Sequence, residues 1–159
     1  MQTHDIAIRV DGVELRASVS PRLLLSDFLR EQARVGGVHV ACGQGVCGAC
    51  TVVVDGVPVR ACLMLAIQAD GTLVQTIASL PQLEGNEPQE GLTRLQRAFR
   101  HHHALQCGYC TPGLLVATAK FLATTPAPDR AQILEHLNGH LCRCSGYANI
   151  VAAIESVRA

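Results

Sequence analysis

The sequence predicts an α+β protein in which a β-rich first half precedes a helical second half. Apolar and polar residues alternate in short runs over the first half, whereas beyond residue 92 the apolar residues recur at helical spacing. Between these parts, residues 81–91 are rich in Pro, Gly, Glu and Gln, which is typical of a linker. We therefore expect one domain at residues 1–80 and a second at residues 92–159.

The first half should form a sheet built mainly from two hairpins. Asp11-Gly12 and Asp55-Gly56 are strong two-residue turn signals, and each separates two short strand-like runs. Pro58 lacks an amide N–H, so its strand should lie at an edge of the sheet. The expected strands are 5–10, 13–19, 50–54, 57–60 and 73–77.

A helix should follow the first hairpin. Ser20 can cap its N-terminus and Pro21 suits its first helical position. Gly36-Gly37 should end it. Its apolar stripe consists of Leu24, Leu25, Phe28 and Leu29.

Four helices should follow the linker, and their lengths favour a small bundle. Thr111 and Pro112 open a nearly all-apolar helix that reaches about Thr124 and should be buried on all sides. Asp129 should cap the helix after it. The apolar sets of the other three helices are Leu92, Leu95 and Phe99; Ile133, Leu134 and Leu137; and Ile150, Val151, Ile154 and Val157.

The overall composition argues against several classes of function. The formal net charge is zero and there is no basic run, so we expect no nucleic-acid partner. The N-terminus has no secretory signal pattern and no stretch approaches the roughly 18 apolar residues of a membrane span, so we expect a cytoplasmic protein without a span. In that reducing compartment, metal binding explains eight cysteines better than disulfides do.

The first four cysteines have the spacing of an iron–sulfur site. Cys42, Cys47 and Cys50 form a C-x4-C-x2-C run, and Cys62 follows later, as in plant-type [2Fe–2S] proteins. The glycines between them would let the chain wrap an anionic cluster and offer backbone N–H donors. A zinc knuckle or a pair of disulfides is the alternative, but zinc sites usually pair two separate knuckles.

The other four cysteines form two pairs on separate segments. Cys107 and Cys110 lie in "QCGYC", and Cys142 and Cys144 lie in "LCRC". Cys142 and Cys144 are poorly placed to bond each other, so we expect them to hold one side of a metal centre. Spacing alone allows either a second cluster or a zinc ion bound by four cysteines. No cysteine is left over, which favours two complete four-ligand sites.

Four segments in this order resemble the iron–sulfur subunit of the xanthine dehydrogenase, or molybdenum hydroxylase, family: "ACGQGVCGACTVVVDG", "RACL", "ALQCGYCTPG" and "LCRCSGY". The likeness covers nearly the whole chain. It implies an N-terminal β-grasp domain of the plant-type ferredoxin class and a C-terminal four-helix domain, with one [2Fe–2S] cluster in each. It implies that one cluster is bound by Cys42, Cys47, Cys50 and Cys62 and the other by Cys107, Cys110, Cys142 and Cys144.

The resemblance also implies a role in electron transfer without catalytic residues of this chain's own. Electrons would pass one at a time from a large molybdopterin-containing subunit through the two clusters to FAD in a medium subunit. Gln106 matches the family glutamine that hydrogen-bonds the pterin. The assembly would be a hetero-oligomer, such as a heterotrimer or a dimer of heterotrimers. "CTPG" resembles the flavin-containing branch.

Three alternatives remain open at this point. The chain could serve a two-subunit, FAD-free dehydrogenase that feeds a cytochrome, it could be a free two-cluster ferredoxin, or it could be a structural protein with two zinc ions. His39, His136 and His140 are assigned no ligand role, because cysteines already fill all eight ligand positions. His101, His102 and His103, with Arg94, Arg97 and Arg100, are most simply a solvated helix surface.

Overall fold

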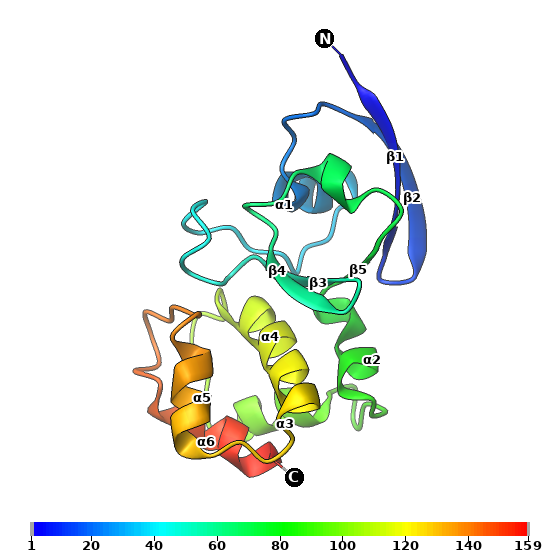
Figure 1. The fold of residues 1–159 in the computed structure, drawn as a ribbon. Helices are drawn as coiled ribbons and strands as arrows, with labels where there is room; N and C mark the ends of the chain where they lie inside the picture. The colour runs from blue at the N-terminus through cyan, green and yellow to red at the C-terminus, as the bar shows by residue number, and fades with distance from the viewer. Residues whose placement is uncertain (1, 159) are drawn as a thin grey trace.

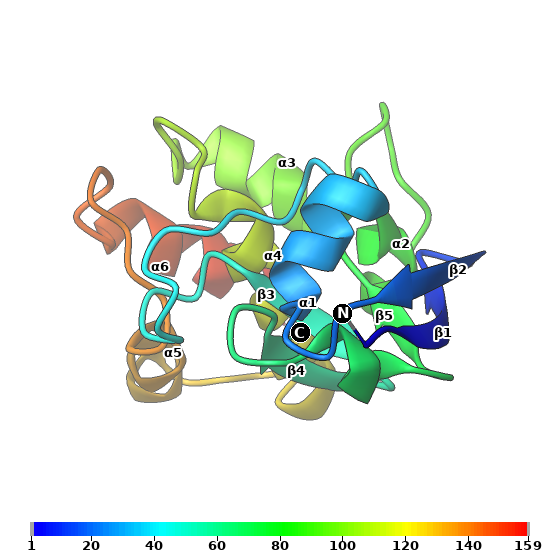
Figure 2. The same cartoon turned by 90° about the horizontal axis from the view of Figure 1, so that it is seen from above.

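The computed structural model describes residues 2–158, which form a sheet domain and a helical domain packed against each other (Figure 1). Helix α4 (Thr111–Thr124) runs beneath strands β3 (Thr51–Val54) and β4 (Val57–Arg60) and contacts both. Viewed from above, the helix that follows the first hairpin lies over the sheet, and α4 lies below it (Figure 2). The α+β class is confirmed.

The five strands form one mixed sheet in the order β2-β1-β5-β3-β4. The two hairpins β1–β2 and β3–β4 are antiparallel, and β5 joins them by pairing parallel to β1 and antiparallel to β3. Both Asp-Gly turns and the edge position of Pro58 are confirmed. The strands are β1 (His4–Val10), β2 (Val13–Val19), β3 (Thr51–Val54), β4 (Val57–Arg60) and β5 (Leu73–Gln75).

The helix after the first hairpin begins later than expected. It consists of α1 (Leu25–Asp27) and a π-helical turn, η1 (Phe28–Gln32), so it also ends before the glycine pair. Leu24 is extended because it forms an antiparallel bridge with Leu65. The prediction that Ser20 caps this helix was wrong, since pairing with a distant segment keeps the intervening chain out of the helix.

Asp11 joins the first hairpin to the segment that follows β5. Its carboxylate accepts hydrogen bonds from the amide and the hydroxyl of Thr76, at 2.7 and 2.6 Å, and from the hydroxyl of Ser79 at 2.6 Å. Thr76 and Ser79 are buried. Without the carboxylate, their donors would lose this partner in a place that water reaches poorly.

We expect Asp11→Ala to lower the free energy of unfolding by about 1–3 kcal/mol, because it leaves buried donors unpaired. Urea titration followed by circular dichroism measures this change. Asp5→Ala, at an exposed position of β1, is the matched control and should change stability by less than about 0.5 kcal/mol. Equal effects of the two substitutions would contradict the role given to Asp11.

The helical domain begins with a short helix, α2, which occupies the first residues of the expected linker. Four further helices correspond to the four that the sequence predicts. Capping boxes join Thr93 to Gln96 and Asp129 to Gln132, so the predicted cap at Asp129 is confirmed. The helices are α2 (Leu80–Glu84), α3 (Arg94–His101), α4 (Thr111–Thr124), α5 (Arg130–Leu137) and α6 (Ala148–Val157).

Helix α4 is the centre of the helical domain. Every residue from Gly113 to Ala119 is buried, whereas residues 120–124 are partly or fully exposed. The prediction of burial on all sides therefore holds for residues 113–119 and not for the two ends of the helix. Within residues 2–158, none of the helices combines the length and apolar character that crossing a lipid bilayer requires.

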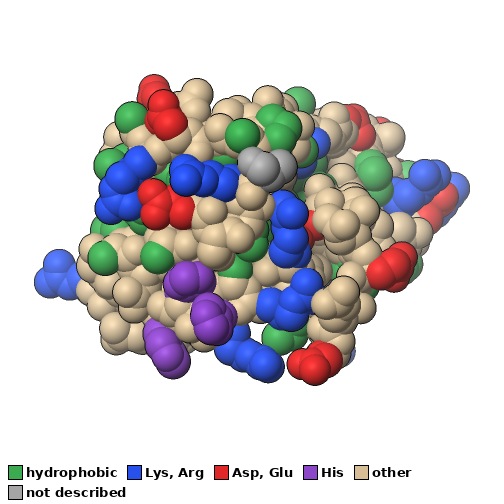
Figure 3. Space-filling model, turned by 90° about the horizontal axis from the view of Figure 1, so that it is seen from below, with side chains coloured by type: hydrophobic (Ala, Val, Ile, Leu, Met, Phe, Trp, Pro, Cys, Tyr) green, Lys and Arg blue, Asp and Glu red, His purple; other side chains and the backbone are tan. Residues whose placement is uncertain are grey.

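Basic side chains gather on the face of the helical domain that is seen from below (Figure 3). They line a groove of about 830 Å³ between α3 and the end of α6. The groove is lined by Arg94, Arg97, Arg100, His101, His102 and His103, together with Ala98, Ser156 and Val157. Most of the basic side chains are exposed, which agrees with the solvated surface that the sequence predicts.

Candidate metal centres

The four cysteines of the sheet domain come from one loop and from the turn after β4. None of the four forms a disulfide, and they lie as two adjacent pairs. The amide N–H of Cys47 donates to Sγ of Cys42 at 3.5 Å. Cys50 and Cys62 are both buried, and their thiols are neighbours. We call Cys42, Cys47, Cys50 and Cys62 the first set.

The loop gives the thiols of the first set different acidities. The backbone N–H groups of Cys47 and Gln44 lower the pKa of Cys42 to about 6. Burial is the main reason that the pKa of Cys50 rises to about 11, and the thiol of Cys62 adds to this rise. A buried thiol of this kind is chemically inert unless a metal takes its proton's place.

Glycines with positive φ shape this loop. Gly43, Gly45 and Gly48 have φ values of +63°, +76° and +77°, which residues with a side chain rarely adopt. The resulting turns bring the N–H of Gln44 to 3.3 Å from Sγ of Cys42. One sulfur of the first set thus has a backbone donor from this loop, and the role of the glycines in wrapping the chain around a cluster stays a prediction.

The four cysteines of the helical domain lie at the N-terminal ends of two helices. Cys107 and Cys110 precede α4, and Cys142 and Cys144 precede α6. The Sγ atoms of Cys107 and Cys144 are 3.5 Å apart, and Cys110 neighbours Cys142. All four line one cavity of about 430 Å³, which also reaches Cys47 of the first set. We call these four residues the second set.

Hydrogen bonds and burial also give the thiols of the second set different pKa values. Burial acts to raise the pKa of Cys142, but the hydroxyl and amide of Ser145 donate to its sulfur at 3.2 and 3.4 Å and lower the pKa overall. Burial raises the pKa of Cys110 to about 12, with a further contribution from Cys142. The adjacent thiol of Cys107 raises the pKa of Cys144.

Two polar side chains support the second set. Gln106 is exposed and its Nε2 donates to the carbonyl of Cys144 at 3.1 Å, so the side chain is held at the surface beside the cysteines. The hydroxyl of Tyr147 donates to the carbonyl of His140 at 3.0 Å and accepts from the amide of Cys142 at 2.9 Å. Tyr147 thus braces the turn that carries the last two cysteines.

The two sets meet at the seam between the domains. The amide of Leu141 donates to the carbonyl of Cys47 at 2.9 Å, which directly joins the loops of the two sets. On another side, the hydroxyl of Tyr109 donates to the carbonyl of Val40 at 2.8 Å. The ring of His39 stacks on Tyr109 and its Nδ1 donates to the tyrosine carbonyl at 2.7 Å.

Sequence reasoning missed residues that build this seam. Among them are Arg60, which donates to the carbonyl of Gly139, and Gly113, which packs on the backbone of Ala49. Arg60 and Gly113 carried no assigned role, and His39 was only excluded as a ligand. The one available signal was their position, because Arg60 opens "RACL" and Gly113 ends "CGYCTPG". Position beside a cysteine motif indicates proximity to a site but does not say what the residue contacts.

His136 lies near the seam, and its titration should make the stability of the fold depend on pH. Its ring stacks on Phe121 at 4.4 Å, and its Nε2 lies 3.2 Å from the hydroxyl of Thr118. Burial, and then the charge of Arg60, lower its pKa from 6.5 to about 4. Between these pH values the unfolded chain binds a proton that the folded chain does not, so the free energy of unfolding falls as the pH is lowered.

We therefore expect His136→Gln to lose less stability than the unsubstituted protein between about pH 6.5 and pH 4. The slope should become shallower without vanishing, because burial also lowers the pKa of His140. Urea unfolding at stepped pH measures the slope. The same slope for both proteins would contradict the low pKa assigned to His136.

The donor atoms fit two iron–sulfur clusters. Each iron of a [2Fe–2S] cluster takes two protein ligands, and each set offers two adjacent pairs of thiols. Within residues 2–158, no three His, Cys, Asp or Glu side chains converge tightly enough to hold a single ion. The fold and the two sets are those expected of a two-domain iron–sulfur protein.

Comparisons with known proteins agree with this class. Residues 8–72 match the family model of the 2Fe-2S iron-sulfur cluster binding domain, and residues 82–155 match that of the [2Fe-2S] binding domain. The caffeine dehydrogenase subunit gamma of Pseudomonas sp. (strain CBB1) is 46% identical, over 99% of this chain and 92% of that protein. A subunit of the probable xanthine dehydrogenase of Bacillus subtilis (strain 168) is 39% identical, over 94% of this chain and 82% of that protein.

A solved structure shows the same fold. The quinoline 2-oxidoreductase of Pseudomonas putida 86 matches with a TM-score of 0.88 and 43% identity, over 98% of this chain and 92% of the matched chain. This chain belongs to the family of small [2Fe–2S] subunits of the xanthine dehydrogenase-like molybdenum hydroxylases. Its function is therefore electron transfer within an oxidoreductase.

Proposed function

We propose that each set of cysteines binds one [2Fe–2S] cluster and that the chain passes electrons between the two clusters one at a time. The first set would bind the cluster of the sheet domain and the second set the cluster of the helical domain. The observation that carries this proposal is the hydrogen bond from the Leu141 amide to the Cys47 carbonyl, at 2.9 Å. It gives the two sites a short connection through the backbone of Leu141 and one hydrogen bond.

The part of this chain in the proposed function is to hold the two clusters and to connect them. Cys47 lies at one end of the connection, and Leu141 is bonded directly to Cys142 at the other end. Each transfer would oxidise one cluster and reduce the other by one electron, without moving an atom between the domains. Backbone and hydroxyl donors to Cys42 and Cys142 would stabilise the negative charge of the thiolates.

We further infer that the electrons enter from a large molybdopterin-containing subunit and leave to FAD in a medium subunit. Relatives of this length are named as subunits, among them the nicotine 6-hydroxylase small subunit of Paenarthrobacter nicotinovorans, which is 41% identical. Gln106 is the residue of this chain that would meet the pterin, since it is exposed beside Cys144. "CTPG" favours the branch that contains FAD.

Exposed apolar side chains next to the second set support a permanent partner over a free ferredoxin. Leu105, Tyr109 and Leu141 are 40%, 43% and 53% exposed, and they flank Gln106 and the cysteines. Tyr109 and Leu141 line the cavity of the second set, and exposed apolar side chains that gather beside a site are typical of a surface that another subunit covers. We therefore propose a cytoplasmic hetero-oligomer, a heterotrimer or a dimer of heterotrimers, in which this surface faces the large subunit.

Anaerobic purification of the complex through a tag on this chain tests the proposal. We expect a large subunit with molybdenum and a medium subunit with FAD to co-purify, as seen by metal analysis and flavin absorbance. Molybdenum without flavin would favour the two-subunit dehydrogenase that feeds a cytochrome. A chain that carries clusters but purifies alone would overturn the assignment of partners and favour the free ferredoxin.

A further inference from the structure

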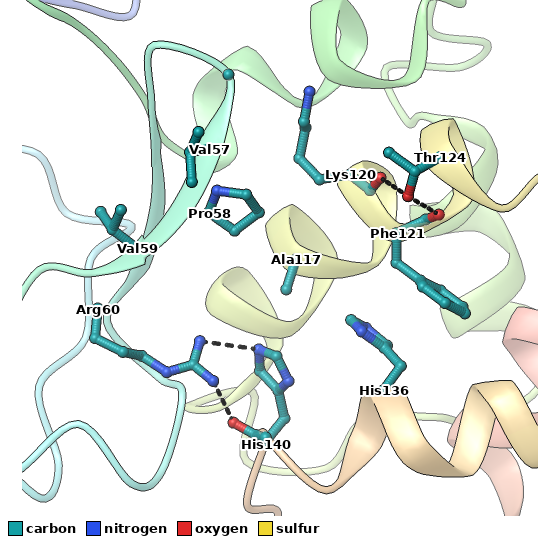
Figure 4. A pocket seen from close by; sticks show the side chains of 12 residues that line it. Val57, Pro58, Val59, Arg60, Ala117, Lys120, Phe121, Thr124, His136 and His140 are labelled. Carbon is teal, nitrogen blue, oxygen red and sulfur yellow. Dashed lines mark hydrogen bonds between the residues drawn. The ribbon is translucent and has the colours of Figure 1, made fainter.

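Arg60, the last residue of β4, reaches from the sheet domain across the seam (Figure 4). Its guanidinium donates to the hydroxyl of Thr51 within its own domain. On the other side it donates to the carbonyl of Gly139 at 2.5 Å, and it faces Nε2 of His140 at 3.5 Å. One planar group thus joins acceptors from both domains, which a lysine ammonium cannot do with the same geometry.

Arg60 connects the segments that lead into the two sets of cysteines. It lies two residues before Cys62 of the first set, and the carbonyl that it holds lies three residues before Cys142 of the second set. The hydrogen bond from Leu141 to Cys47 belongs to the same stretch of backbone. Displacement of the 139–141 turn would therefore lengthen the direct connection between the sets.

The turn lies so close to the first set that little movement is needed to change this spacing. A Cβ atom on Gly48 would lie 2.6 Å from the carbonyl oxygen of Gly139 and equally close to the ring of His140. His140 is only 5% exposed. The backbone of the second segment thus rests directly on the loop of the first set, and Arg60 holds it from the adjacent side.

The charge of Arg60 is not used in an ion pair. Among residues 2–158, the ion pairs found join Arg16 to Glu14 and Arg130 to Glu155. The cavity of about 500 Å³ between β4 and α4, which Arg60 lines, has no Asp or Glu in its wall. The guanidinium of Arg60 therefore contacts only uncharged acceptors among these groups. What these contacts contribute is to hold the 139–141 turn in position.

From these contacts we propose that Arg60 is a positioning residue that sets the spacing between the two sets of cysteines. This inference rests on the proposed function, because the spacing matters only if electrons cross the seam. Arg60 fixes the 139–141 turn against the first set, which keeps the bond between Leu141 and Cys47 formed. Both sides of this contact belong to the same chain, so the chain can be tested without a partner subunit.

Two substitutions separate position from charge. Arg60→Lys keeps the charge but loses the fork of N–H donors, whereas Arg60→Gln loses both. We expect both variants to bind as much iron as the unsubstituted chain. In both, amide hydrogen exchange at Leu141 should be at least about tenfold faster, because charge-assisted hydrogen bonds that close the seam are lost.

Electron paramagnetic resonance on the full chain reports the spacing between the two clusters directly. In the dithionite-reduced chain the two paramagnetic clusters couple through space, and the coupling falls steeply with separation. We expect weaker or more heterogeneous coupling in both Arg60 variants. Arg16→Gln, at an exposed position of β2, is the control. It should leave both the hydrogen exchange at Leu141 and the coupling between the clusters unchanged.

The outcomes are distinct. Unchanged exchange and coupling in both variants would overturn the positioning role. Normal coupling in Arg60→Lys with altered reduction potentials in Arg60→Gln would also overturn it, since charge alone would then matter. If the unsubstituted chain held no iron, the proposed function would fail, while faster exchange at Leu141 in the variants would still show that Arg60 holds the turn.

Discussion

A chain carrying Cys142→Ala should contain about two iron and two sulfide atoms instead of about four of each. Cys142 shares one cavity with the other three cysteines of the second set, and Ser145 donates to its sulfur twice. The first set supplies its own four thiols, so its cluster should remain. Iron and acid-labile sulfide analysis with electron paramagnetic resonance measures the loss of one of the two signals.

The reciprocal variant, Cys50→Ala, should remove the other cluster and leave the signal that Cys142→Ala removes. Ser145→Ala is the matched control, because it deletes a donor to the sulfur of Cys142 but keeps the thiol. We expect this control to retain about four iron atoms. Full iron content in Cys142→Ala would show that this cysteine is not a ligand.

Gly113→Ala should open the seam and lower the free energy of unfolding by about 1–3 kcal/mol. Alanine normally stabilises a helix interior by roughly 0.5–1 kcal/mol relative to glycine. Here a Cβ atom would lie 2.7 Å from the carbonyl oxygen of Ala49 and would also meet the carbonyl of Gly48. These are backbone atoms of the first-set loop, so they cannot turn aside as a flexible side chain would.

Urea titration and hydrogen exchange across α4 and the 41–50 loop measure this effect. Gly36→Ala is the matched control, because no atom lies within 4 Å of its Cβ position and its φ is not in the left-handed region. The control should shift stability by no more than about 0.5 kcal/mol. If Gly113→Ala were as stable as the unsubstituted chain, the close packing of α4 on the first-set loop would be refuted.

The features that the sequence predicted well depend on neighbours in the chain. Asp11-Gly12 and Asp55-Gly56 specify tight turns by their own backbone preferences, so both hairpins formed at the expected residues. The helix from Thr111 to Thr124 was located by its long apolar run, and Asp129 by its cap. In each case the energetic cause lies within a few residues of the signal.

The features that the sequence did not predict depend on remote partners. Ser20 and Pro21 carry good start signals for a helix, yet pairing of Leu24 with Leu65 overrides them. Arg60 could as well have been a solvated residue at a strand end, because its acceptors across the seam lie about eighty residues away in the chain. The spacing of apolar residues and the local preferences for helix, strand or turn contain no information about such contacts.

The candidate metal centres fall between these cases. Spacing separated the eight cysteines into two sets of four, and the structure brings each set together. Spacing did not show which thiols would be neighbours, such as Cys107 with Cys144. It also gave no hint that Leu141 would join the second set to Cys47, since that bond is made only when the domains pack.

Metal and acid-labile sulfide content of the anaerobically purified chain, with paramagnetic resonance after dithionite reduction, tests the central claim most directly. We predict about four iron and four sulfide atoms per chain and two distinguishable rhombic signals of spin one-half. About two iron atoms and a single signal would leave one set without its proposed cluster. Zinc in both sites, with no sulfide and no signal, would contradict the redox function of the chain altogether.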